Sequence, residues 1–259
     1  MSETEINQDK ENEQKNENNK KEEKSENINE IINPEIDSIK NNENIDIIIN
    51  DEIQKEEEQK EEELSEVDTF KKKYNIKENT SEIEIYNKHI GDNGIKILLE
   101  IPQNRLKTLN LYGNDIKYIS FITKIKTDNL ERLYLYNNKI SDISLLEKVN
   151  LSNLLELCLD NNCFKDISVL EKINCNKLHK LYLSSNKISD ISVLEKVNFP
   201  ELLKLDLSGN EIIDITALEK KKFEKLTTLD ISQNKINYSE PKNKNIVRNL
   251  KKIIEEFEY

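Results

Sequence analysis

The chain has 259 residues and a formal net charge of −12. The charge is uneven: residues 1–70 hold 24 acidic and 8 basic residues (net −16), and the remainder holds 27 acidic and 31 basic residues (net +4). The near-neutral body excludes the strongly basic surface of a typical nucleic-acid-binding domain, and three cysteines without a C-x-x-C pair argue against a disulfide framework or a structural zinc site.

The start of the chain, Met1 to Glu5, has neither the basic nor the apolar region of a secretory signal, so we expect none. No stretch approaches the 18 or more apolar residues that a membrane-spanning helix needs. With so few cysteines, these features favour a reducing compartment. We therefore expect a cytoplasmic protein, with the nucleus as an alternative.

Residues 1–73 are rich in Glu, Asn and Lys and are predicted to form a disordered acidic tail, because such a composition buries too little apolar surface to fold. Within it, Ile45 to Glu52 resembles the motif that binds small ubiquitin-like modifiers by adding a strand to a sheet edge. A chance cluster of isoleucines is the alternative interpretation. Residues 55–74 are rich in helix formers and are interpreted as a solvated helix or a linker.

Residues 74–240 are organised by a 24-residue repeat whose first leucine recurs at Leu106, Leu130, Leu154, Leu178, Leu202 and Leu226. Each unit reads L-x-x-L-x-[LI]-x-x-N-x-[IF], which resembles the leucine-rich repeat family. The resemblance implies an α/β solenoid with a parallel concave β-sheet and short convex helices. In each strand, alternation places two leucines inward and their neighbours outward.

The asparagine of each unit is predicted to bond backbone groups at the bend after the strand. The second half of the unit reads N-x-I-x-D-I-x-x-L, similar to the branch of the family that includes regulatory subunits of protein phosphatase 1 and bacterial internalins. A Ser/Thr-x-x-Glu pattern then predicts a capping box at each convex helix. The boxes are Ser144/Glu147, Ser168/Glu171, Ser192/Glu195 and Thr216/Glu219.

Both ends of the repeat array are predicted to be capped. Residues 82–105 resemble a ribonuclease-inhibitor type of repeat, with Asp92 or Asn93 capping a longer helix that buries Ile95, Leu98 and Leu99. Residues 241–259 are predicted to form a C-terminal capping helix, and a partner-binding helix is the alternative. Its apolar residues follow helical spacing: Ile246, Val247, Leu250, Ile253, Ile254 and Phe257.

The candidate binding site lies among the outward residues of the strands. Tyrosine and arginine are enriched at interface hot spots, and a solenoid commonly binds its partner on the concave face. Small serines and aspartates on the later strands form an expected acidic rim. The alternative is that tyrosine simply suits strands and that the rings stack on each other. The candidate residues are Tyr86, Tyr112, Arg132, Tyr134, Tyr136 and Tyr182, with Asp206 and Asp230 as the rim.

No catalytic motif is present, because neither His89 nor His179 has a nucleophile or carboxylate placed beside it by a motif. Cys158 falls on the same face and is interpreted as an inert thiol. We therefore predict a non-catalytic, monomeric protein-protein interaction module that needs no cofactor and no small-molecule substrate. The alternatives are a regulatory subunit of a protein phosphatase, or a histone-chaperone-like binder that uses the acidic tail.

Overall fold

The structure, a computed structural model, describes residues 66–77, 79–221 and 223–259. The predicted disordered tail up to residue 65, with the Ile45 to Glu52 segment, lies outside these residues. Among the residues described, no helix is both long and apolar enough to cross a membrane.

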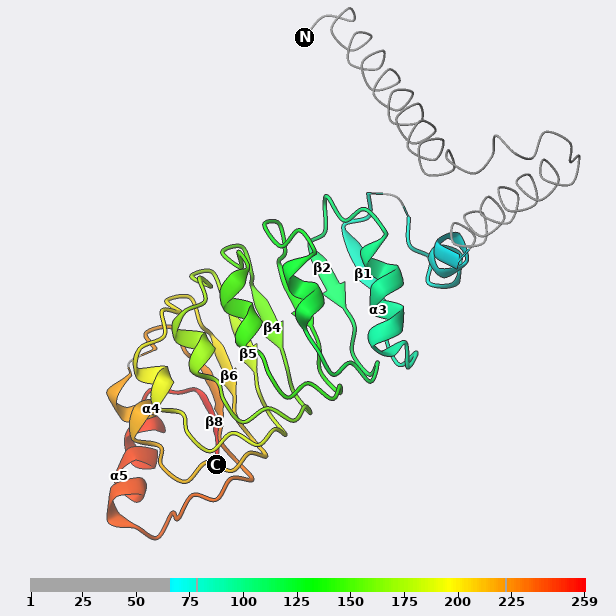
Figure 1. The fold of residues 1–259 in the computed structure, drawn as a ribbon. Coiled ribbons are helices and arrows are strands. Elements are labelled where there is room, and N and C mark those ends of the chain that lie inside the picture. The colour runs from blue at the N-terminus through cyan, green and yellow to red at the C-terminus, as the bar shows by residue number, and fades with distance from the viewer. Residues whose placement is uncertain (1–65, 78, 222) are drawn as a thin grey trace, which may run out of the picture. The chain divides into compact units, whose positions relative to one another are not determined.

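One parallel sheet of eight strands runs through the described part of the chain, with its strands in sequence order. Figure 1 shows the strands stacked in succession, with the short helices on the side opposite the sheet. The predicted solenoid is therefore confirmed. The strands are β1 (Glu82–Glu84), β2 (Thr108–Asn110), β3 (Arg132–Tyr134), β4 (Glu156–Cys158), β5 (Lys180–Tyr182), β6 (Lys204–Asp206), β7 (Thr228–Asp230) and β8 (Glu256–Glu258).

The leucine repeat sets the register of this sheet. The central residue of each strand from β2 to β7 is a leucine that pairs with the leucine 24 residues away, as Leu133 does with Leu157. These leucines are at most 1% exposed. Because side chains alternate along a strand, the residues on either side of each leucine must face outward. The hydrophobic core thus lies behind the sheet, and the outward residues form an open surface.

The side opposite the sheet consists of single helical turns. These are the 3-10 helices η2 (Ser120–Thr123), η3 (Ser144–Lys148), η4 (Ser168–Glu171) and η5 (Ser192–Glu195), followed by the α-helix α4 (Thr216–Lys220).

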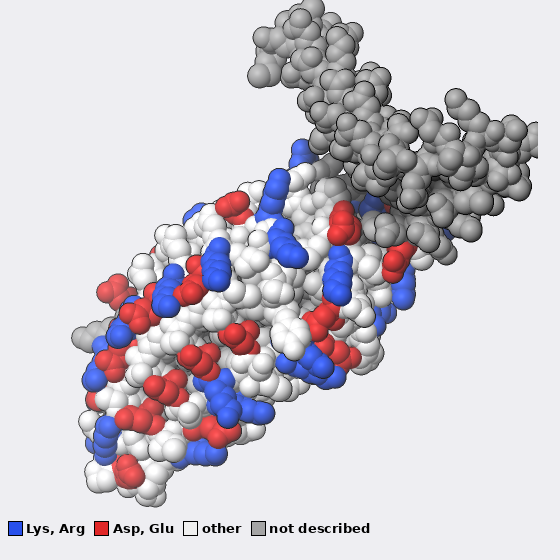
Figure 2. All heavy atoms as spheres, viewed as in Figure 1, with Lys and Arg blue, Asp and Glu red and all other residues white. Residues whose placement is uncertain are grey.

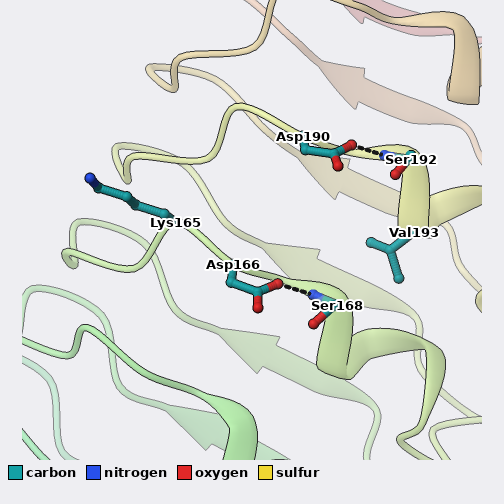
Figure 3. A pocket seen from close by; sticks show the side chains of 6 residues that line it. All are labelled: Lys165, Asp166, Ser168, Asp190, Ser192 and Val193. Atoms are coloured by element: carbon teal, nitrogen blue, oxygen red, sulfur yellow. Dashed lines mark hydrogen bonds between the residues drawn. The ribbon is translucent and has the colours of Figure 1, made fainter.

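The predicted capping boxes are wrong. In the four turns with a predicted box, no side chain caps the N-cap residue. Instead, an aspartate two residues before the Ser or Thr accepts a hydrogen bond from its backbone N–H. Figure 3 shows two of these bonds, from the Ser168 N–H to Asp166 (2.7 Å) and from the Ser192 N–H to Asp190 (2.8 Å). The aspartate of the N-x-I-x-D motif takes this role because its short side chain reaches the backbone N–H of the residue two positions later.

At the N-terminal end, α3 (Gly91–Leu99) buries Ile95 and Leu98 as predicted, and Leu99 is partly buried. The predicted cap is wrong: the N-cap residue is Ile90, and Asp92 instead contacts the backbone N–H of Lys117 in the next repeat. Residues 66–73 are helical. Phe70, which the sequence analysis assigns to the tail, is 7% exposed and packs in the core.

At the C-terminal end, the helix expected over 241–259 is wrong beyond Leu250. The helix α5 (Pro241–Leu250) buries Ile246 and Val247, and its packing partner is α4. The chain then turns and forms β8, where Phe257 pairs with Leu229 of β7. Ile253 is 66% exposed. A strand forms here because the last repeat leaves unpaired backbone groups, which the Glu256 N–H and the Glu258 carbonyl satisfy.

The predicted role of the repeat asparagines is confirmed, and we call their hydrogen bonds the asparagine ladder. Asn138 shows the pattern: its Nδ2 donates to the carbonyls of Leu111 and Leu135, and its Oδ1 accepts from the N–H groups of Asn114 and Ile116. One side chain therefore joins its own repeat to the preceding one. The Nδ2 group bonds a carbonyl of the preceding unit in Asn114, Asn138, Asn162, Asn186, Asn210 and Asn234.

Ion pairs join neighbouring repeats over the exterior. On the helical side, Lys172 contacts Glu147 at 2.9 Å, and Lys220 contacts Glu195 at 3.0 Å. Figure 2 shows one face of the molecule with basic and acidic side chains interspersed. Because both partners are exposed to solvent, such pairs add little to stability.

Replacing Asn138 with alanine tests the ladder. The change leaves several buried backbone groups without a partner, and we expect the free energy of unfolding to fall by about 3 kcal/mol. Chemical denaturation followed by circular dichroism measures the difference. Asn176→Ala is the matched control, because Asn176 is exposed and makes no side-chain hydrogen bond among the described residues. Equal stability of the two variants would contradict the role of the ladder.

The two edge strands test whether charge keeps copies of the chain apart. Both read glutamate, apolar residue, glutamate: Glu82 and Glu84 in β1, and Glu256 and Glu258 in β8. Pairing the β8 edge of one copy with the β1 edge of another would set like charges opposite each other, which is unfavourable. We expect the unaltered chain to sediment as a monomer at low salt and Glu256→Lys/Glu258→Lys to associate.

The control for this experiment reverses both edges. Adding Glu82→Lys and Glu84→Lys restores like charges at the two edges and is expected to restore the sedimentation of the unaltered chain. Association of the fourfold variant, or none in the twofold variant, would show that edge charge does not govern contacts between copies.

Candidate protein-binding site

Three columns of outward side chains cross the sheet, and we call their surface the sheet face. The paired strands confirm the predicted register of the first two columns. The first column contains Glu82, Thr108, Arg132, Glu156, Lys180, Lys204, Thr228 and Glu256. The middle column contains Glu84, Asn110, Tyr134, Cys158, Tyr182, Asp206, Asp230 and Glu258. The third, just after the strands, contains Tyr86, Tyr112, Tyr136, Asp160, Ser184, Ser208 and Ser232.

A stack of three tyrosines occupies the N-terminal part of the third column. The ring centroids of Tyr86 and Tyr112 are 5.2 Å apart, those of Tyr112 and Tyr136 are 4.4 Å apart, and each pair is inclined by 6°. The strand pairing, with an offset of 26 residues from β1 to β2 and 24 from β2 to β3, places the rings on neighbouring strands, about one strand spacing apart. The Asn87 Nδ2 donates to the Tyr112 hydroxyl at 2.7 Å, and Tyr86 is 45% exposed. The stack is therefore held in place and open to solvent.

Tyr134 stands beside this stack in the middle column. Its hydroxyl donates to the Glu156 carboxylate at 3.0 Å. Burial raises the pKa of Tyr134 above its ordinary value, and the hydrogen bond to Glu156 raises it further. Arg132 precedes it on β3 and lies 3.7 Å from Glu131. Tyr134 thus remains a neutral, oriented phenol at neutral pH.

Tyr182 is separated from these residues by β4, because Cys158 occupies the middle-column position between Tyr134 and Tyr182. Burial raises the pKa of Tyr182 to about 12, and the charge of Glu156 adds to the effect. The Lys204 ammonium lies 5.3 Å from the centre of the Tyr182 ring. The structure therefore brings Tyr86, Tyr112 and Tyr136 into one stack but not Tyr182.

The predicted rim residues Asp206 and Asp230 lie on the last repeats of the middle column. The Asp206 Oδ1 accepts from the backbone N–H of Ser208 at 3.0 Å, and the Asp230 Oδ1 accepts from that of Ser232 at 2.8 Å. The two aspartates face each other in the pairing of β6 and β7. They form a continuous acidic edge with Glu258 of β8.

Asp160 is a residue that the sequence analysis did not single out as part of the site. Burial raises the pKa of the Asp160 carboxyl, against hydrogen bonds from Cys158 and Ser184 that lower it, and nearby Asp206 raises it further. Cys158 is 8% exposed, and its Sγ donates to the Asp160 Oδ2 at 3.2 Å. Burial raises the pKa of the thiol, so Cys158 is protonated at neutral pH. The signal in the sequence that could have identified Asp160 is its position in the third column, where an aspartate stands between the tyrosines and the serines.

The described residues offer little support for a metal-binding or catalytic site. Within the described residues, no three His, Cys, Asp or Glu side chains are grouped to hold a metal ion. His89 contacts Asp115, which also pairs with Lys139. A hollow of about 280 Å³ lies away from the sheet face. Figure 3 shows its lining, where Asp166 and Asp190 each already accept a hydrogen bond from a backbone N–H. None of these features forms a nucleophile paired with a base.

Comparison with known proteins places these features in context. A family model of two leucine-rich repeats matches residues 104–148, 128–172 and 152–196, and a model of one leucine-rich repeat matches residues 224–239. A comparison with curated proteins finds no match.

Solved structures with a similar fold include an internalin (inlF) from Listeria monocytogenes, which is 27% identical with a TM-score of 0.55. The match covers 74% of this chain and 48% of the internalin, so the chain spans about half the length of that protein. An internalin C2 from the same organism is 28% identical over 58% of this chain and 80% of its own, with a TM-score of 0.42. A PEPR1-AtPEP1 structure is 25% identical over 54% and 20%, with a TM-score of 0.43.

A pH-dependent stability measurement tests the environment of Asp160. The folded-state pKa of Asp160 lies above the ordinary value of 3.8. The stabilisation that the protonated carboxyl contributes is therefore fully present below pH 3.8 and is lost as the pH rises through the folded-state pKa. We expect Asp160→Asn to raise the free energy of unfolding at about pH 7 and the gain to shrink as the pH falls toward about 4.

Asp142→Asn is the matched control with the opposite sign. The Ser144 N–H lowers the pKa of Asp142, so its stabilisation is present above the ordinary pKa and is lost on acidification. We expect this variant to be less stable than the unaltered chain at about pH 7. A pH-independent gain from Asp160→Asn would contradict the raised pKa.

Proposed function

We propose, from the premise that this chain is a leucine-rich repeat protein, that it acts as a protein-interaction module whose partner binds on the sheet face. The family supports the interaction module, since a repeat solenoid presents an extended rigid surface to a partner. The location of the partner is our proposal and rests on the side chains of the sheet face.

The stack of Tyr86, Tyr112 and Tyr136 is the observation on which the proposal depends most. Aromatic rings bring a large contact area at a low cost in conformational entropy, and their hydroxyls supply hydrogen bonds at the rim of an interface. Here the rings are preorganised by stacking and by the bond from Asn87 to Tyr112. The rings stack on each other, as the alternative interpretation expected, but Tyr86 is exposed and Tyr112 and Tyr136 are only partly buried, so the stack still offers aromatic surface to a macromolecule.

The form of the surface also favours a protein ligand. A small molecule is normally enclosed by a pocket of about 300–1,000 Å³ with a mainly apolar lining. The sheet face is instead an open row of side chains, in which Arg132, Tyr134 and Tyr182 extend the contact area across β3 to β5. Polar and aromatic residues in that arrangement suit a protein surface or an extended segment.

Selection of binders from a displayed peptide library tests this function. The library is first depleted on an immobilised full-length Tyr112→Ala/Tyr136→Ala variant and is then selected on the unaltered full-length chain. Because both baits contain the acidic tail, depletion removes peptides that bind there. We expect the retained peptides to bind the double variant at least about tenfold more weakly, the loss expected at a hot spot.

Tyr118→Ala is the matched control, since Tyr118 is 67% exposed and lies outside the sheet face. It should leave affinity unchanged, and all three proteins should show the same thermal unfolding midpoint. Selected peptides that bind the double variant as tightly as the unaltered chain, or a selection that enriches none, would contradict binding at the tyrosine stack.

A further inference from the structure

The sheet face is more acidic than the rest of the repeat body. Its three columns contain eight acidic and three basic side chains, a net charge of −5. Residues 71–259 total +4, so the remainder of that stretch has a net charge of +9. All three basic side chains, Arg132, Lys180 and Lys204, are in the first column, which also has three acidic ones. The middle and third columns therefore hold five carboxylates and no base.

We infer that the partner of the sheet face is a basic protein segment whose arginine and lysine side chains lie along the acidic edge and over the tyrosines. This inference rests on the proposed function and adds the chemistry of the ligand. A basic segment is favoured because its charge complements a face that the fold itself leaves uncompensated.

The acidic edge of the middle column lacks the ion pairs found elsewhere. On the helical side, Glu147, Glu171 and Glu195 each contact a lysine of the next repeat. Among the described residues, Asp206 and Asp230 contact no lysine or arginine in an ion pair. Each uses its Oδ1 for a neighbouring serine and leaves its Oδ2 without a hydrogen bond. These oxygens are available to a ligand.

Like charges are also placed side by side along this edge. Asp206 pairs with Asp230, and Asp230 pairs with Glu258, on consecutive strands. Direct opposition of like charges on neighbouring strands is destabilising, so the chain retains an unfavourable arrangement here. Burial raises the pKa of the nearby Asp160, and the charge of Asp206 raises it further. A bound cation would relieve this repulsion, and local conflicts of this kind are expected at functional sites.

The tyrosines lie where they can complete the recognition of a cation. Tyr182 is directly beside Asp206 in the register of β5 and β6. A guanidinium can form two hydrogen bonds to a carboxylate and stack on an aromatic ring. Lys204, which already lies 5.3 Å from the Tyr182 ring centre, shows that a cation is accommodated there. Five strand gaps separate Tyr112 from Asp230, roughly 24 Å, which an extended segment of about seven residues spans.

A matched pair of synthetic peptides tests the inference on the full-length chain. One alternates arginine and serine over about twelve residues, a length that exceeds the estimated span. The other has citrulline in place of every arginine, which keeps the shape and removes the charge. Each contains one benzophenone, so that mass spectrometry can locate the cross-link. Affinity is measured by fluorescence anisotropy for the unaltered chain, Asp206→Asn/Asp230→Asn, and the control Glu100→Gln/Glu224→Gln, which removes two charges outside the sheet face.

We expect the arginine peptide to cross-link within residues 82–258 and to bind Asp206→Asn/Asp230→Asn about fivefold more weakly, as the loss of two exposed ion pairs would give. The control should change affinity less than about twofold, and the citrulline peptide should bind at least about tenfold more weakly. Cross-links confined to the tail, equal losses in both variants, or equal affinity for both peptides would each overturn the inference.

The outcomes separate this inference from the proposed function. If library peptides depend on Tyr112 and Tyr136 but are neutral or acidic, the sheet face is the binding site and the basic partner is wrong. If the library peptides bind the Tyr112→Ala/Tyr136→Ala variant as tightly as the unaltered chain, the proposed function itself fails.

Discussion

The buried asparagine ladder is the interaction on which the rest of the structure depends. At the end of each strand the chain turns into the interior, where backbone groups have no water and must find another partner. Asn138 and Asn162 supply it: each donates to a carbonyl of the preceding repeat and accepts from an N–H there. Because one amide serves two repeats, it fixes how neighbouring repeats stack, and from β2 to β7 the spacing between repeats is 24 residues. A constant spacing keeps the strands in register, which in turn aligns the outward columns.

This dependence explains why much of the fold was predictable. The recurrence of Leu106 through Leu226 and the asparagine after each strand determine the strand pairing, the inward leucines and the outward columns. Features outside that period were not predictable in the same way. Phe257 follows Leu229 by 28 residues, and the apolar spacing from Ile246 onward also fits a helix, so periodicity alone gave the wrong element for β8. Only the open edge of β7 decides between the two.

The candidate site was also predictable only where its residues follow the repeat. The positions of Tyr86, Tyr112 and Tyr136 followed from the repeat, but whether the rings would stack depended on side-chain rotamers that a sequence does not contain. Asp160 was missed because partial burial of a carboxylate results from its neighbours, Cys158 and Ser184, and from the approach of Asp206. Likewise, the convex turns were placed correctly but explained by the wrong residue, since Asp142 and not Ser144 provides the acceptor. The Asp carboxylate and the Ser hydroxyl are both possible acceptors for the N–H groups at the start of the turn, and the motif alone does not rank them.

Position within the repeat thus separates stability from recognition. Inward leucines and the ladder asparagine provide the buried contacts, and exterior lysines pair with glutamates of the next repeat, as Lys220 does with Glu195. The outward positions contribute local contacts instead: Asp160, Asp206 and Asp230 each accept a hydrogen bond from a backbone N–H. Here the sheet face holds stacked tyrosines beside aspartates that, among the described residues, form no ion pair. Asp206 and Asp230 each accept from a serine N–H of their own repeat, but no contact among the described residues requires the two carboxylates to lie side by side. The basic ligand that we propose accounts for this arrangement of charge.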